Sequence, residues 1–178
     1  MDRQTAIEVL SEWDNKGRYV FTLHDLAKLF PNDKPKTLQE GVNRLVRSGT
    51  LQRACRGVYV YALARISDSH TIERVTQALR RGEYNYISLE SALSEYGAIS
   101  QIPLDRLTVM TSGRKGIYNT PWGTIEFTHT KRAASDIIAN THKTTHPLRK
   151  ATAHTAWRDL KRVGRNTHLV DKQALNHE

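Results

Sequence analysis

Residues 34–61 constrain the fold more than any other part of the chain. Pro35 suits the first turn of a helix because its φ is already set and it needs no amide partner, and Gly49 suits the left-handed residue that ends one. Between them, apolar residues recur at the spacing of one helix face, which predicts an amphipathic helix. The apolar positions are Leu38, Val42, Leu45 and Val46, and the opposite face holds Lys36, Thr37, Gln39, Glu40, Asn43, Arg44 and Arg47.

A β-hairpin is predicted directly after this helix. Two β-prone runs, 50–53 and 58–61, are separated by four residues that include Gly57, so the chain is expected to fold back on itself. Arg53 and Arg56 then lie near the tip of the hairpin. Cys55 is the single cysteine of the chain, which excludes an internal disulfide framework.

Two further helices are predicted before this stretch. Residues 2–15 show the apolar stripe of a helix that ends at Gly17, and residues 23–30 form a second helix after a short extended run. Thr22 suits the cap of the second helix, with Asp25 at the acidic position of a capping box. The order helix, strand, helix, turn, helix, hairpin is typical of a winged helix-turn-helix. We therefore predict a winged helix-turn-helix DNA-binding domain over residues 1–65.

The charge of the chain favours a nucleic-acid partner. Its 178 residues carry 27 Lys and Arg against 18 Asp and Glu, a formal net charge of +9, which favours a polyanion. Residues 1–65 carry 11 basic and 7 acidic side chains (net +4), residues 66–146 carry 9 and 8 (net +1), and residues 147–178 carry 7 and 3 (net +4). Side chains that hydrogen-bond to base edges and cations that hold phosphates are both present in the first domain. The predicted DNA-binding residues are Lys34, Lys36, Thr37, Gln39, Asn43, Arg44, Arg47, Arg53 and Arg56.

Residues 66–178 are predicted to form a second domain. Ser67, Asp68 and Ser69 supply turn and cap residues before a helix over 70–81, and Ser88 is expected to cap a helix that ends near Gly97. Three β-prone runs predict a small antiparallel sheet. A short helix over 133–139, a loop over 141–147 and a last, basic helix over 148–163 follow. The predicted fold class is α+β, with an N-terminal winged helix-turn-helix and a small mixed helix and antiparallel-sheet domain. The three β-prone runs are 106–111, 115–119 and 124–128.

Four segments together resemble the AbiEi family of type IV antitoxins. They are RGVYVY (56–61), YISLESALSEYG (86–97), LTVMTSGRKGIYNTPWGTIEF (107–127) and DLKRVGRNTHLVD (159–171). The resemblance implies that the first domain binds inverted repeats in the promoter of its own operon and represses it. It implies that the second domain counters a nucleotidyltransferase toxin without forming a stable complex with it.

A lone winged module covers little DNA. We therefore expect two copies on an inverted repeat of operator DNA, either as monomers that pair on the DNA or as a homodimer. Three alternatives stay open from the residues. The chain could be a plain winged-helix regulator without a toxin, a module that binds a toxin directly, or a nuclease.

Catalytic and metal-binding signatures are weak in this sequence. His142 and His146 lie four residues apart, but Pro147 disfavours the helix that would align them as metal ligands. A magnesium-dependent nuclease would need an acid-x-Lys pair, and Glu126 is followed two positions later by Thr128. We therefore expect a protein that is not an enzyme and that has no catalytic residues, no metal site and no cofactor.

The compartment and the remaining aromatic residues complete the expectations. No apolar run approaches the roughly 20 residues of a membrane helix, and the N-terminus lacks the apolar core of a signal peptide. We expect a cytoplasmic protein without membrane contact. Trp122 and Trp157 are expected in the core rather than as stacking platforms.

Overall fold

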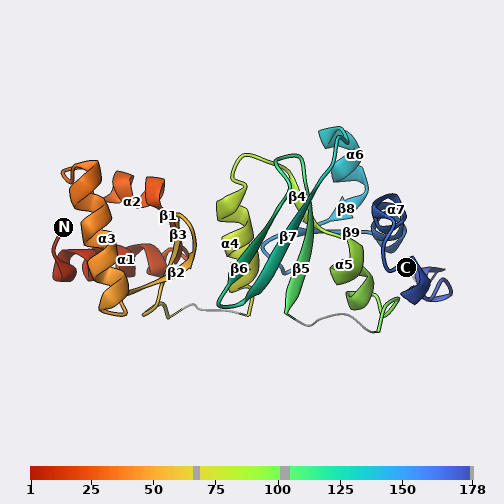
Figure 1. Cartoon of the computed structure of the whole chain (residues 1–178), viewed down its shortest axis with the longest axis horizontal. Coiled ribbons are helices and arrows are strands. Elements are labelled where there is room, and N and C mark those ends of the chain that lie inside the picture. Colours follow the sequence, from red (N-terminus) through yellow and green to blue (C-terminus); the bar gives the residue numbers. More distant parts are fainter. Residues whose placement is uncertain (66–68, 101–104, 177–178) are drawn as a thin grey trace. The chain divides into compact units, whose positions relative to one another are not determined.

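The computed structural model describes residues 1–65, 69–100 and 105–176, and it divides the chain into two compact units, Met1–Leu79 and Arg80–Glu178 (Figure 1). The described residues form seven α-helices and two β-sheets, which confirms the predicted α+β class. The predicted turn residues Ser67 and Asp68 lie outside the described residues. Within the described ranges, no helix is long and apolar enough to cross a membrane.

The described residues of the first unit form four helices and an antiparallel three-stranded sheet with the strand order β1-β3-β2. Its core consists of fully buried apolar side chains from the helices and from the sheet, among them Leu10, Phe21, Leu26 and Val42. The bounds of its elements are α1 (Arg3–Asn15), β1 (Val20–Thr22), α2 (Leu23–Leu29), α3 (Pro35–Arg47), β2 (Leu51–Cys55), β3 (Val58–Tyr61) and α4 (Thr71–Leu79).

Local signals set the ends of these helices. The side chain of Thr22 accepts a hydrogen bond from the backbone N–H of Asp25, and the Asp25 carboxylate accepts one from the backbone N–H of Thr22, which is the predicted capping box of α2. Pro35 occupies the first turn of α3, and Gly49 after this helix has a φ of +72°. A side chain would strain that left-handed backbone, so glycine ends α3 without conformational cost.

Helix α4 completes the first unit. The predicted domain boundary lies after residue 65, whereas the compact unit extends through Leu79 because α4 packs on β1 and β3. The hydroxyls of Tyr19 and Thr71 lie 3.0 Å apart in a buried hydrogen bond, and Val75 is fully buried. The backbone N–H of Arg65 donates to the carboxylate of Asp14 at 2.8 Å, which ties the chain after β3 back to α1.

The second unit is built on a six-stranded mixed sheet with the order β6-β7-β5-β4-β9-β8. The prediction of a small antiparallel sheet was wrong, because β5 and β7 are parallel neighbours and β6 pairs only with the outer edge of β7. Helix α5 packs on β5 and against α7. The bounds are β4 (Asn85–Ile87), α5 (Leu89–Glu95), β5 (Arg106–Thr111), β6 (Gly116–Thr120), β7 (Gly123–His129), α6 (Ala134–Ala139), β8 (Thr141–His142), β9 (Arg149–Ala151) and α7 (Ala153–Val163), followed by short 3-10 turns at Thr167–Leu169 and Ala174–Asn176.

The predicted last helix begins later than expected. Residues Arg149–Ala151 form strand β9, which pairs in parallel with β4 and antiparallel with β8. Strand β8 lies within residues 141–147, which were predicted to be a loop. Helix α7 starts only after Thr152, whose side chain accepts a hydrogen bond from the backbone N–H of Thr155. Gly164, with a φ of +77°, ends it as predicted.

The start of α5 also differs from the prediction. Ser88 precedes the helix, but its hydroxyl makes no capping hydrogen bond and donates instead to Asp159 at 2.8 Å. Leu89 follows with a φ of +57° while its side chain is fully buried. A non-glycine residue rarely adopts this left-handed conformation. The chain therefore enters α5 through a strained residue that the surrounding core holds in place.

Candidate nucleic-acid interface

The predicted DNA-binding residues lie on the surface of the first unit. All of them are exposed except Gln39, which is half-buried. The opposite face of α3 is buried at Leu38, Gly41, Val42 and Leu45, while Val46 is half-buried. Helix α3 therefore presents a continuous polar face, and the residues exposed on it are Lys36, Thr37, Glu40, Asn43, Arg44 and Arg47.

Two weak contacts orient side chains on this face. The Gln39 amide donates to the Asn43 side-chain oxygen at 3.3 Å, and an Arg44 guanidinium nitrogen donates to the backbone oxygen of Met1 at 3.3 Å. Both hydrogen bonds are long and exposed, so a stronger partner can replace them at little cost. The Asn43 amide nitrogen is free to donate, since Asn43 uses only its oxygen in this contact.

The hairpin presents two arginines. Arg56 and Gly57 form the turn between β2 and β3, and Gly57 has a φ of +78°. The guanidinium of Arg53 lies 6.0 Å from the centre of the Tyr59 ring, and the pairing of β2 with β3 shifts register between Arg53 and Cys55. Such a bulge increases the local twist of a hairpin. Arg53 and Arg56 are both exposed, so the turn carries two cations to the surface.

The structure adds one cation that the sequence did not single out. The Nε of Arg3 lies 3.4 Å from the Thr50 hydroxyl, which places this exposed side chain beside the residue that directly precedes β2. Arg3 belongs to α1 and stands 47 positions before Thr50. Helical periodicity gives no signal for a contact over that separation, so only the tertiary structure could reveal it.

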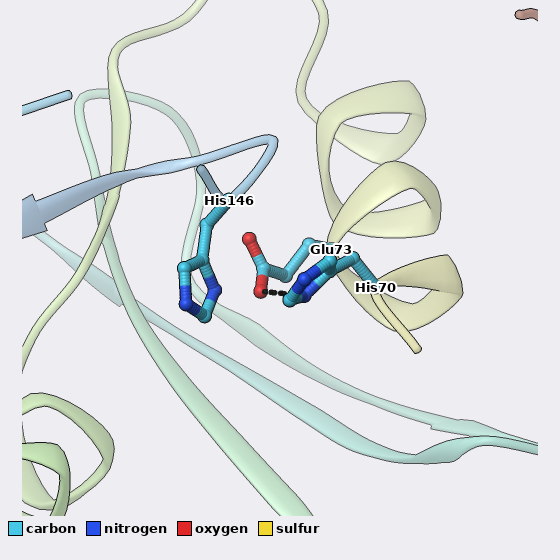
Figure 2. Close-up of side chains that lie close together, drawn as sticks. All are labelled: His70, Glu73 and His146. Atoms are coloured by element: carbon cyan, nitrogen blue, oxygen red, sulfur yellow. Dashed lines mark hydrogen bonds and ion pairs between the residues drawn. The ribbon is translucent and has the colours of Figure 1, made fainter. Parts of the chain in front are cut away.

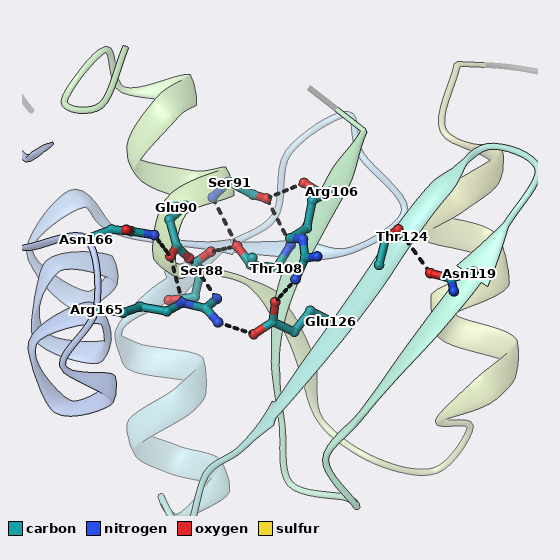
Figure 3. A network of polar contacts seen from close by, with 10 residues as sticks. All are labelled: Ser88, Glu90, Ser91, Arg106, Thr108, Asn119, Thr124, Glu126, Arg165 and Asn166. Carbon is teal, nitrogen blue, oxygen red and sulfur yellow. Dashed lines mark hydrogen bonds and ion pairs between the residues drawn. The ribbon is translucent and has the colours of Figure 1, made fainter. Parts of the chain in front are cut away.

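The second unit holds a network of alternating charges (Figure 3). The guanidinium of Arg165 donates two hydrogen bonds to the Glu90 carboxylate, at 2.8 and 3.1 Å, and a third to Glu126 at 2.5 Å. The other oxygen of Glu126 accepts from Arg106 at 2.6 Å, and the Asn166 amide donates to Glu90 at 2.9 Å. Both carboxylates are buried, with exposed fractions of 5% and 7%. This network fastens the chain after α7 to α5 and to the sheet.

The same network bears on the nuclease alternative. Each carboxylate oxygen of Glu126 already accepts a hydrogen bond from a guanidinium group. A magnesium site needs carboxylate oxygens that are open to the ion. Glu126 is thus engaged in holding the structure together, which disfavours the role of a metal ligand.

The electrostatics of Glu90 follow from these contacts. Burial raises the pKa of the Glu90 carboxyl, but the hydrogen bonds from Arg165 and Asn166 outweigh burial and leave the pKa below its ordinary value. The hydrogen bonds from Arg165 to Glu90 raise the pKa of the Arg165 guanidinium above its ordinary value. The pair is therefore charged on both sides throughout the neutral range.

A third buried carboxylate of the second unit, Asp159, belongs to α7. It accepts hydrogen bonds from Ser88 at 2.8 Å and from the Tyr86 hydroxyl at 3.2 Å, and the guanidinium of Arg132 lies 2.6 Å away. Burial raises the pKa of Asp159 despite these partners. Burial and the Asp159 charge likewise raise the pKa of the Tyr86 hydroxyl. Asp159 connects α7 to the strand and the turn before α5.

His70 and His142 each lie close to a polar side chain of a neighbouring residue or element. Figure 2 shows His70 at the start of α4, with its Nδ1 3.2 Å from a carboxylate oxygen of Glu73. His142 lies in β8, where its Nε2 is 3.5 Å from the Tyr96 hydroxyl. Trp122 and Trp157, which were predicted to be core residues, are half-buried.

Comparisons with known proteins give a distant structural neighbour. No protein-family profile matches the chain, and no curated protein sequence matches it significantly. Among solved structures, the fold is similar to the crystal structure of the RV2827C protein from Mycobacterium tuberculosis, with a TM-score of 0.49 and 18% sequence identity. The alignment covers 76% of this chain and 48% of that chain, so this chain spans about half the length of its neighbour. Similarity at this level carries no conclusion about function.

Proposed function

We propose that this protein is a DNA-binding transcriptional repressor whose first unit acts as a winged helix-turn-helix. The observation that carries the proposal is the exposed face of α3, where amide and hydroxyl side chains are mixed with cations on a helix whose other face is buried. A helix of this kind can enter the major groove of duplex DNA. The order of α1, β1, α2, α3, β2 and β3 supports this assignment, with α3 as recognition helix and the β2–β3 hairpin as the wing.

Readout and affinity are divided between these two elements in the proposal. Asn43 can form a bidentate pair with adenine, and Arg44 can form one with guanine. The cations that flank them and those on the wing hold phosphates, which gives affinity without sequence preference. Lys34, Lys36, Arg47, Arg53 and Arg56 take the phosphate role, while Thr37 and Gln39 support the base contacts.

We further propose that the protein is the autoregulating antitoxin of a type IV toxin–antitoxin system. Two segments that resemble the AbiEi family, 86–97 and 159–171, lie far apart in the sequence and meet in the second unit through Ser88 with Asp159 and through Glu90 with Arg165. That association supports a functional unit separate from the DNA-binding one. In this proposal two copies bind an inverted repeat, and the second unit counters a nucleotidyltransferase toxin without a stable complex.

The experiment that tests DNA readout begins with selection of preferred sites from a random duplex library by the full chain. Asn43→Ala and Arg44→Ala should each lose about 1 to 3 kcal/mol of discrimination against a wrong base at one position of the selected site. Arg56→Ala should instead weaken binding to selected and unrelated duplexes alike and lower the salt slope by about one. Lys16→Ala serves as a control, since it removes an exposed cation that is already paired with Glu12 at the end of α1. Sequence preferences unchanged in both α3 variants would refute this reading of α3.

A further inference from the structure

The outward face of α7 is basic, and the proposed function does not use it. Arg158, Lys161 and Arg162 are exposed on this helix, which is drawn in blue in Figure 1. Its inward face is fixed by the buried residues Asp159 and Leu160. Arg158 and Arg162 lie four positions apart, so they stand about 6 Å apart along one side of the helix.

The positive charge of these three residues is only partly compensated by carboxylates. Arg158 forms a loose ion pair with Asp136 at 3.8 Å, which is beyond hydrogen-bond distance. Arg162 donates to the backbone oxygen of His129 at 3.1 Å, a partner that orients the guanidinium without cancelling its charge. Lys161 lies 5.3 Å from the centre of the Trp157 ring, again a neutral partner.

Other arginines of the same unit are used differently. Arg132 lies 2.6 Å from the buried carboxylate of Asp159, and Arg165 is held by Glu90 and Glu126 (Figure 3). Their charges are compensated inside the fold and are not available to a polyanion. Arg158, Lys161 and Arg162 differ from them in lying exposed together on one helix.

We propose that the outward face of α7 binds the phosphate backbone of duplex DNA as a second contact surface. The choice of nucleic acid as the partner rests on the proposed function. The surface itself is identified by the exposed cations of α7. Cations one helical turn apart suit a regular array of phosphates. A single strand would need open aromatic faces for base stacking, and Lys161 covers the ring of Trp157. A protein partner would be expected to find an open aromatic or apolar anchor in the patch, whereas the half-buried ring of Trp157 lies against the Lys161 ammonium.

The test compares two double variants of the full chain on a random-sequence duplex of about 30 base pairs. Arg158→Gln with Lys161→Gln removes two charges from α7. Arg114→Gln with Lys115→Gln removes two exposed charges from the loop between β5 and β6 and serves as the matched control. Binding is measured over a salt series, and thermal unfolding confirms that both variants fold.

The α7 variant should lower the slope of log affinity against log salt by about 1.8, since each phosphate contact contributes about 0.9. The control should leave the slope unchanged, and the charge-retaining variant Arg158→Lys with Lys161→Arg should restore it. Equal loss of slope in the α7 variant and the control would mean that only net charge matters and would overturn the proposal. An unchanged slope in the α7 variant would also overturn it and would direct attention to an acidic protein partner.

The same measurements separate this proposal from the proposed function. If Arg44→Ala relaxes sequence preference while the α7 variant keeps its salt slope, the repressor assignment stands and the α7 surface is refuted. If the α7 variant loses slope while both α3 variants keep their preferences, the α7 surface stands and the assignment of α3 is refuted.

Discussion

Arg44 and Arg47 on α3 are exposed to solvent, whereas Arg165 in the second unit lies among the buried carboxylates of Glu90 and Glu126. Arg44 contacts only a backbone oxygen among the described residues. Arg165 makes hydrogen bonds to both carboxylates. The two regions show that a count of basic residues overstates the charge available to DNA. The net charge of a segment matters less than which of its cations have a carboxylate partner.

The largest effect is expected from cutting the first unit at two places. A fragment of residues 1–79 keeps α4 and should unfold cooperatively and bind duplex DNA, because its charges on α3 do not depend on the second unit. A fragment of residues 1–65 loses the burial of Val75, worth about 1.5 to 3 kcal/mol, and exposes the hydroxyl of Tyr19. Since about 65 residues are marginal for a lone core, it should not fold stably. Thermal melts by circular dichroism compare the two, and equal melting temperatures would contradict the role given to α4.

The next effect separates structural from surface arginines. Arg165→Ala leaves the buried Glu90 without a cation and Glu126 with Arg106 alone, and it should lower the free energy of unfolding by about 2 to 4 kcal/mol. A loss near the low end of this range is expected, because the Arg165 side chain is itself 35% exposed and solvent screens its charge. Arg47→Ala, an exposed control on α3, should change it by no more than about 0.5 kcal/mol. Urea denaturation measures the free energy of unfolding of both variants. Similar losses in the two would contradict the distinction between a structural arginine and a surface arginine.

The smallest effect concerns acid. Because the pKa of Glu90 is lower in the folded state than in the unfolded chain, its stabilising contribution is present above the unfolded pKa and is lost as pH falls through the folded one. Asp159 acts in the opposite direction, since its raised pKa favours the folded state below the unfolded pKa and that contribution is lost as pH rises through the raised value. Glu90→Gln should therefore flatten the fall in stability on acidification. Urea denaturation at a series of acid pH values checks this. An unchanged pH dependence of stability would show that Glu90 does not contribute to it.

Features set by neighbouring residues could be predicted from the sequence. The capping box of Thr22 and Asp25 spans four positions, and the bounds of α3 follow from Pro35 and from the glycine after it. The apolar face of α3 is a matter of helical spacing alone. For the same reason the exposed DNA-binding candidates could be identified without knowledge of any tertiary contact.

Features set by distant residues could not be predicted. Ser88 has the chemistry of a cap, but its partner Asp159 lies 71 positions away. Strand β9 consists of Arg149, Lys150 and Ala151, which are good helix formers, and it is extended because it pairs with β4. The parallel pairing of β5 with β7 places β6 outside them, an order that an alternating pattern does not encode. The network of Arg165 likewise depends on side chains from four separate segments.

Leu89 limits the range of sequences that this fold can accept. Its left-handed backbone costs a leucine about 1 to 2 kcal/mol, while its fully buried side chain contributes about 1.5 to 3 kcal/mol. Glycine would remove the first cost and forfeit the second contribution, and valine or isoleucine would keep the burial but fit the backbone worse. A saturation library at position 89 should therefore return few functional variants, because few residues meet both requirements. The backbone conformation of this one residue therefore limits which substitutions the protein tolerates at position 89.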